Sequence, residues 1–137
     1  GYNYRMTNIQ AAIGCAQLED IEHILNLKLK LAQKYRSTLS KKVLFQDCNP
    51  EKSSNWINTI LLQDETEVKS MNHRLKKNNI EVRPGFPLVN KMICYQDSNI
   101  EHLSVSESIS SRTICLPSYP DLSEDEQSLI ISTVLDK

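Results

Sequence analysis

The sequence has little glycine, few aromatic residues and no surplus of either charge. Of its 137 residues, only three are glycine and 6% are aromatic. So few glycines exclude a glycine-rich phosphate loop, whose turns need several residues without a side chain. The 16 basic and 17 acidic residues give a net charge of −1, so the global field favours neither nucleic acid nor an anionic membrane as a partner. A basic stretch from Lys28 to Lys42 is typical of a solvated helix face.

The cysteines and histidines form no metal or redox motif. The four cysteines are far apart, with neither a CxxC pair nor the Cys/His spacing of a zinc site. Because three of them have apolar neighbours, we predict buried, reduced thiols in a cytoplasmic protein. The three histidines are too dispersed to predict a metal site, and no Ser/His/Asp order is present. No apolar run approaches the roughly 18 residues that cross a bilayer.

Two capping boxes predict helix starts. Thr7 and Gln10 have the required spacing, and Ser123 and Glu126 repeat it near the end of the chain. After the first box, apolar residues recur in steps of three and four, which predicts one long helix over residues 8–39. We expect the apolar face near its start to lack a partner within this chain. The second box opens a final helix whose inward residues are expected to be Leu129, Ile130, Val134 and Leu135.

The intervening sequence predicts a small sheet with helices on it. Residue types and breakers predict strands at 43–46, 56–62, 80–83 and 113–116, helices at 65–78 and 104–112, and a loop over 84–103. This order indicates an α+β fold, with helices on a small, mostly antiparallel sheet. We therefore divide the chain into a junction loop with a long interdomain helix, 1–39, and a small α+β domain, 40–137.

Four stretches carry a resemblance to one family. The run GYNYRMTNIQAAIGCAQLEDIE at residues 1–22 resembles the segment after the cofactor lysine in the DegT/DnrJ/EryC1/StrS family of sugar aminotransferases. Downstream, SNWINTILL at 54–62 is similar to the family's aromatic strand, and LKKNNIEVRP at 75–84 to its helix and GIxTRP strand. LPSYPDLSEDE at 116–126 is similar to its LPxxPxLxxEE element. These landmarks keep the family order over nearly the whole chain.

The resemblance implies the small C-terminal domain of a fold-type-I enzyme that uses pyridoxal 5′-phosphate. In the family, the lysine that binds this cofactor and the acid at its ring nitrogen lie upstream of the matched segment. No lysine here has a similar context, so we assign no catalytic residue and expect the isolated chain to be inactive. The chain starts at Gly1 in a loop-like run without an initiator Met, so we expect it to be part of a longer protein.

Asn3, Tyr4 and Arg5 are the first candidate site residues. Their amide, phenol and guanidinium groups can bind a phosphate or carboxylate, and the adjacent helix N-terminus adds partial positive charge. Taken alone, these residues are more typical of an ordinary surface loop than of a binding site. The resemblance implies that Asn3 reaches the cofactor phosphate of the neighbouring subunit in a dimer with shared active sites. Arg5 would bind there too, or anchor the loop by an ion pair.

Arg83 is the second candidate, as a substrate-binding residue. A guanidinium can bind a carboxylate or a diphosphate through two hydrogen bonds, and Arg83 precedes Pro84 at a predicted strand end. The resemblance places substrate-proximal residues there, and the alternative is an exposed strand-end arginine. The next run, Gly85–Asn90, departs from the family's PxH element.

The resemblance implies a nucleotide-sugar aminotransferase. Such an enzyme moves an amino group from an amino acid such as glutamate to a keto sugar on a nucleotide, in polysaccharide or amino-sugar biosynthesis. The alternative is a non-catalytic assembly module derived from that family, which would pair through its long helix with itself or with an N-terminal half.

Overall fold

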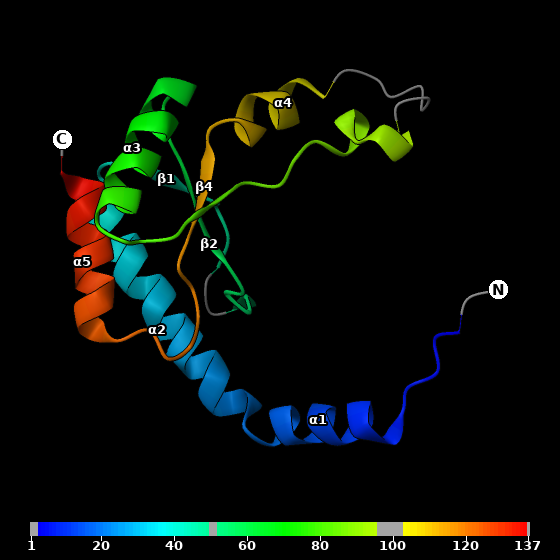
Figure 1. Cartoon of the computed structure of the whole chain (residues 1–137). Coiled ribbons are helices and arrows are strands. Elements are labelled where there is room, and N and C mark those ends of the chain that lie inside the picture. Colours follow the sequence, from blue (N-terminus) through cyan, green and yellow to red (C-terminus); the bar gives the residue numbers. More distant parts are fainter. Residues whose placement is uncertain (1–2, 50–51, 96–102, 137) are drawn as a thin grey trace.

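A computed structural model describes residues 3–49, 52–95 and 103–136 of the chain (Figure 1). Its elements, in chain order, are the helices α1 (Asn8–Glu19) and α2 (Ile21–Leu39), strands β1 (Leu44–Phe45) and β2 (Asn58–Leu61), helix α3 (Glu65–Lys77), strand β3 (Arg83–Pro84), the short 3-10 helices η2 (Val89–Lys91) and η3 (Ile93–Tyr95), helix α4 (Ser104–Ser110), strand β4 (Thr113–Leu116) and helix α5 (Glu124–Leu135). This order confirms the predicted α+β class.

The strands form one antiparallel sheet in the order β1-β2-β4-β3. In the central pair, Ile60 lies opposite Ile114, and Thr59 lies opposite Cys115. Because successive side chains alternate between faces, the two isoleucines share the core face and are fully buried. Thr59 and Cys115 share the other face, where both are only partly buried. The sheet therefore has one packed face and one more open face.

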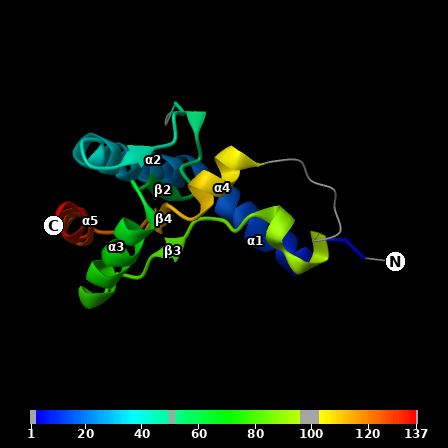
Figure 2. The same ribbon diagram turned by 90° about the horizontal axis from the view of Figure 1, so that it is seen from above.

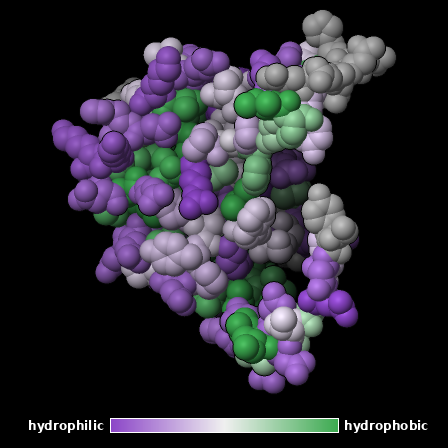
Figure 3. Space-filling view, turned by 45° about the vertical axis from the view of Figure 1, so that its right-hand side comes forward, coloured by the Kyte–Doolittle hydropathy of each residue, from purple (hydrophilic) through white to green (hydrophobic). Residues whose placement is uncertain are grey.

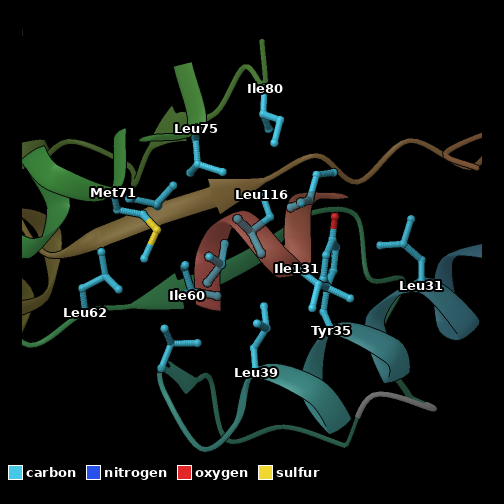
Figure 4. Close-up of a cluster of buried hydrophobic side chains, with 14 residues drawn as sticks. Leu31, Tyr35, Leu39, Ile60, Leu62, Met71, Leu75, Ile80, Leu116 and Ile131 are labelled. Atoms are coloured by element: carbon cyan, nitrogen blue, oxygen red, sulfur yellow. The ribbon is translucent and has the colours of Figure 1, made fainter. Parts of the chain in front are cut away.

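The core lies between the packed sheet face and helices α2, α3 and α5 (Figures 1 and 2). Figure 4 shows Leu31, Tyr35 and Leu39 of α2 pointing toward Ile60 and Leu116 of the sheet, with Met71 and Leu75 of α3 and Ile131 of α5 completing the cluster. The Tyr35 phenol, although buried, donates a hydrogen bond to the Pro117 carbonyl at 3.1 Å. Its polar end is thus satisfied inside the core, and burial raises its pKa.

The prediction of one long helix over residues 8–39 is wrong at one residue, because Asp20 divides that stretch into α1 and α2. The backbone of Asp20 (φ −108°, ψ 11°) leaves the helical range, so α1 ends there and α2 starts in a new direction (Figure 1). Asp is a weak helix former whose side chain favours helix ends. No residue of α1 is buried, and Ile9 and Ile13, which lie one turn apart on the same face, are exposed; this confirms the expected unpartnered apolar face near the start of the helix.

The predicted strand at 80–83 begins later, because Ile80 belongs to the end of α3. Asn79 takes a left-handed backbone (φ 57°), its N–H donates to Lys76 O at 3.0 Å, and the Ile80 N–H donates to Leu75 O at 2.9 Å. These are the two hydrogen bonds of a Schellman motif, and both Leu75 and Ile80 are buried in the core. The predicted helix stop at Asn78–Asn79 is confirmed, and β3 is left with Arg83–Pro84.

The inward face of α5 differs from the prediction at two positions. Ile130 and Val134 are buried as expected, but Leu129 and Leu135 are exposed, while Gln127 and Ile131 are buried instead. Four of the five buried residues, Gln127, Ile130, Ile131 and Val134, follow the i, i+3, i+4, i+7 spacing of a single helix face, which the predicted set did not; the fifth is Thr133. Gln127 Nε2 donates to Leu31 O at 2.9 Å, so this polar side chain ties α5 to α2.

The four cysteines are free but not buried, contrary to the prediction. Cys15 and Cys94 are exposed, and Cys48 and Cys115 are half-buried. Cys15 lies on α1, which packs against no core element, and Cys115 points to the more open face of the sheet. Apolar neighbours in the sequence therefore did not indicate burial in the fold. Among the described residues, no helix is long and apolar enough to cross a membrane.

Two arms extend from the same side of the molecule. Helix α1 forms the lower arm and the η2–η3 segment the upper one, and both project away from α5, with the more open sheet face between them (Figures 1 and 2). Figure 3 shows hydrophobic side chains on both arms. The exposed apolar residues there include Ile9, Ile13, Val89 and Ile93.

Candidate functional site

The candidate phosphate-binding residues lie in an extended segment just before α1. The first capping box fixes how this segment joins the helix. Thr7 Oγ1 accepts a hydrogen bond from Gln10 N at 3.3 Å, and Gln10 Oε1 accepts one from Thr7 N at 2.9 Å. Both predicted capping boxes are confirmed. The first one defines the direction in which residues 3–5 leave the helix.

Asn3 and Arg5 are joined by hydrogen bonds. Asn3 Oδ1 accepts from Arg5 N at 3.0 Å and from Arg5 Nε at 3.3 Å. Within the described part of the chain, the amide nitrogen of Asn3 donates to no protein atom, and Arg5 forms no ion pair. Asn3, Tyr4 and Arg5 are all exposed. The carbonyl end of the amide is thus held by Arg5, and the NH₂ end is left to donate.

These donors suit the phosphate end of pyridoxal 5′-phosphate. The Asn3 amide and the Arg5 guanidinium are both donors to anionic oxygen, and they lie beside a helix N-terminus. The rest of the cofactor would need a lysine and an acid for its ring, and the described residues contain no group of that kind next to Asn3. The segment fits a contributing role at the phosphate rather than a complete cofactor site.

Lys28 is the one lysine that the described structure buries, and it was predicted to lie on a solvated face. Its Nζ donates to the carbonyls of Trp56, at 2.8 Å, and of Ser118. Burial lowers the pKa of Lys28. The ammonium therefore joins α2 to the segments at the start of β2 and the end of β4, and its hydrogen bonds are directed at the protein backbone.

Arg83 borders a cleft at the end of the sheet. The cleft has a volume of about 870 Å³, and its walls come from α2, the segment before β2, the α3–β3 connection and the β4–α5 connection. Arg83 is exposed in β3 opposite Cys115, and its side chain makes no hydrogen bond or ion pair with any described residue. Lys28, Trp56 and Tyr119 also line the cleft. The guanidinium is thus available to a carboxylate or diphosphate.

One wall of the cleft carries a fixed carboxylate. Glu126 Oε2 accepts hydrogen bonds from Ser123 Oγ at 2.7 Å and Ser123 N at 2.9 Å, and these bonds lower the pKa of Glu126. The neighbouring Tyr119 has a raised pKa, from partial desolvation and then from the nearby Glu126 charge. At neutral pH this wall therefore presents a carboxylate and a neutral phenol.

The structure does not bring the two candidate sites together. Residues 3–5 lie at the tip of the lower arm, whereas β3 belongs to the sheet (Figures 1 and 2). Sequence reasoning identified Asn3 and Arg83 but missed that Lys28, Trp56 and Tyr119 line the same cleft as Arg83. The signal available for Trp56 was its position as the only tryptophan, just before a predicted strand. No group of three or more metal-ligating side chains occurs among the described residues.

Comparison with known proteins places this small α+β unit among the aminotransferases. The chain belongs to the DegT/DnrJ/EryC1/StrS aminotransferase family, whose model matches residues 1–135. It is 39% identical to the GDP-perosamine synthase of Vibrio cholerae, over 91% of this chain and 35% of that protein. It is 31% identical to the dTDP-4-amino-4,6-dideoxy-D-glucose transaminase of Escherichia coli, over 91% of this chain and 36% of that protein.

Solved structures agree on the fold. An aminotransferase of this family from Brucella abortus superposes with a TM-score of 0.86 at 24% identity, covering 95% of this chain and 35% of that one. The Helicobacter pylori aminotransferase PseC superposes with a TM-score of 0.84 at 24% identity, covering 98% of this chain and 38% of that one. The chain spans about a third of the length of the curated relatives that it matches.

Proposed function

We propose that this chain forms the C-terminal part of a pyridoxal-phosphate-dependent nucleotide-sugar aminotransferase. The observation that carries the proposal is the family match over residues 1–135, with relatives named for GDP- and dTDP-linked sugars. In this proposal the enzyme transfers an amino group from an amino acid such as glutamate to a keto sugar on a nucleotide. Its product would enter polysaccharide or amino-sugar biosynthesis.

In this function the Asn3 segment holds a phosphate. The Asn3 NH₂ donates to a phosphate oxygen, and Arg5 fixes the amide by its two bonds to Asn3 Oδ1. Pyridoxal phosphate, when bound, supplies the aldehyde and the electron-accepting ring that transamination requires. Because α1 carries the segment away from its own sheet (Figure 1), we propose that the phosphate belongs to the neighbouring subunit of a homodimer.

Arg83 takes the role of an anion-binding residue for the substrates. Its guanidinium has no protein partner among the described residues and faces a cleft large enough for a small molecule. It can bind the carboxylate of the amino donor or the diphosphate of the sugar nucleotide. The isolated chain is expected to be inactive, because none of its lysines has a sequence context like that of the family's cofactor lysine, and the buried Lys28 donates to two backbone carbonyls.

A chimera tests this proposal. Residues 1–135 replace the matching segment of the V. cholerae GDP-perosamine synthase, and the protein is purified with pyridoxal phosphate. We expect cofactor absorbance, a spectral change on addition of glutamate, and amination of the keto-sugar nucleotide. A chimera that is folded by circular dichroism and dimeric by light scattering, yet gives no spectral change with any amino donor, would overturn the proposal.

The second candidate function is a non-catalytic assembly module, which the exposed apolar face of α1 favours. Ile9 and Ile13 are exposed on one face of a helix without a buried residue. In this function α1 pairs with a second copy or with a separately encoded N-terminal half. Size-exclusion chromatography with light scattering separates the two functions, since a monomer that binds no aminotransferase half excludes the assembly module.

A further inference from the structure

Trp56 and Phe86 form an exposed pair of aromatic rings beside the Arg83 cleft. Their ring centroids are 6.3 Å apart and their planes are tilted by 34°. Trp56 is 68% exposed and Phe86 is 67% exposed, although large aromatic rings usually bury most of their surface. One ring precedes β2 and the other follows β3, on either side of β4 in the sheet order. The pair therefore brings together the segment before β2 and the segment after β3.

The backbone that carries the Trp56 ring is firmly held. Asn55, just before it, is buried in a left-handed backbone conformation (φ 46°) that a non-glycine residue adopts only at a cost in free energy. The Trp56 carbonyl accepts a hydrogen bond from the buried Lys28 ammonium. An uncommon backbone and a buried cation thus fix the position of a ring that itself contributes little to the core.

The backbone around Phe86 is also held, by two hydrogen bonds. Its carbonyl accepts a hydrogen bond from Ser110 Oγ at 3.2 Å, and the preceding Gly85 N–H donates to Thr113 O at 3.1 Å. Both rings are therefore exposed while their backbones are anchored, which is how a rigid stacking surface is built. Trp56 and Arg83 line the same cleft, so an anion-binding guanidinium borders this surface.

We infer that the Trp56–Phe86 pair is the binding surface for the nucleotide base of the substrate. The base stacks on the Trp56 indole, Phe86 supports that ring, and Arg83 binds the diphosphate. Base–aromatic stacking suits any base, since every base has a π face, and its affinity depends on the ring rather than on hydrogen-bond readout. Glu81 and Glu126 also line the cleft, so the charges on its walls nearly balance. The aromatic surface, rather than net charge, therefore gives the cleft its preference for a base over a free anion. This inference rests on the proposed nucleotide-sugar substrate.

The only tryptophan of the chain gives a direct measurement. The chain is titrated with GDP at constant ionic strength, and the fluorescence of Trp56 is followed. We expect saturable quenching by GDP, weaker quenching by guanosine, and none by inorganic pyrophosphate or mannose. Phe86→Ala should weaken GDP binding by about ten-fold, and Arg83→Gln should weaken the binding of GDP but not that of guanosine. For Trp56→Ala, which removes the fluorescent ring, GDP binding is measured by calorimetry. This variant should bind GDP at least about ten-fold more weakly.

Tyr95→Ala is the matched control, because it removes a partly exposed ring outside the pair. It should leave GDP binding unchanged, and circular dichroism checks the fold of every variant. Equal quenching by pyrophosphate or mannose, no quenching by millimolar GDP, or no effect of Phe86→Ala would each overturn the inference. These measurements need no pyridoxal phosphate. A chimera that transaminates while the chain binds no base would therefore retain the proposed function and reject only the base-binding surface.

Discussion

Gly85 lies so close to Thr113 that a Cβ added at position 85 would overlap the Thr113 hydroxyl and come within 2.9 Å of the Thr113 Cβ. The backbone of Gly85 needs no positive φ, so space alone requires glycine here. This close approach lets the Gly85 N–H bond to Thr113 O and extends the β3–β4 pairing by one residue.

Gly85→Ala should lower the free energy of unfolding by about 1–3 kcal/mol, because the added methyl has no room. Thr113→Ala in the same chain removes the overlapping hydroxyl and should recover part of the loss. Gly14→Ala is the control, since nothing lies within 4 Å of a Cβ there and α1 should gain about 0.5–1 kcal/mol of helix stability. Urea denaturation measures the parent and the three variants, and a Gly85→Ala protein as stable as the parent would contradict the argument.

The two capping boxes should differ in their effect on stability. Ser123→Ala should cost about 1 kcal/mol of global stability, because α5 packs into the core. Thr7→Ala should leave global unfolding nearly unchanged and speed amide hydrogen exchange in α1, which buries no residue. Ser132→Ala is the control for loss of a hydroxyl, because Ser132 is exposed near the other end of α5 and its hydroxyl donates only to Leu129 O of the same helix. Equal losses of global stability from both caps would show that α1 and the core unfold together.

Lys28→Met should lower the free energy of unfolding by about 1–3 kcal/mol, because the Trp56 and Ser118 carbonyls lose their buried donor. Lys30→Met, an exposed lysine on the same helix, should change stability little. Denaturant titration of both variants gives the comparison. A Lys28→Met protein that keeps full stability would mean that other donors or water satisfy these carbonyls.

The lowered pKa of Lys28 also predicts a pH dependence with a definite sign. Since the folded pKa lies below the ordinary 10.5, the folded state binds fewer protons than the unfolded state between those two values. Stability from this group therefore rises with pH across that window. The free energy of unfolding is measured up to pH 10 for the parent and Lys28→Met proteins. Only the parent should show this rise with pH. The same slope in both proteins would assign it to other groups.

Asn3→Asp should weaken pyridoxal phosphate binding by the chimera about ten-fold or more, because it exchanges the donating NH₂ for a negative oxygen beside the phosphate. Gln17→Glu makes the same chemical change at the other end of α1 and is the charge control. Equilibrium dialysis of the cofactor gives both affinities. Equal cofactor affinities in the two variants would contradict the proposal that Asn3 binds the phosphate.

Local features were predictable from the sequence, and contacts between distant segments were not. The capping residues Thr7 and Ser123, and the helix stop at Asn79, act within a few residues of their own position. Lys28 is buried because its partners come from positions 56 and 118, and no periodicity along α2 reveals them. The family resemblance drew attention to Asn3 and Arg83, but only the fold shows that one chain holds them apart.

Because the chain changes direction at Asp20, a small rotation there moves the far end of α1 by a larger distance. With twelve residues, the helix is about 18 Å long, so a rotation of about 10° at Asp20 moves its far end by about 3 Å. That displacement is as long as the hydrogen bond that Asn3 would donate to a phosphate. If Asn3 binds the phosphate as proposed, the backbone angles of one aspartate, seventeen residues away, would set the position of its amide.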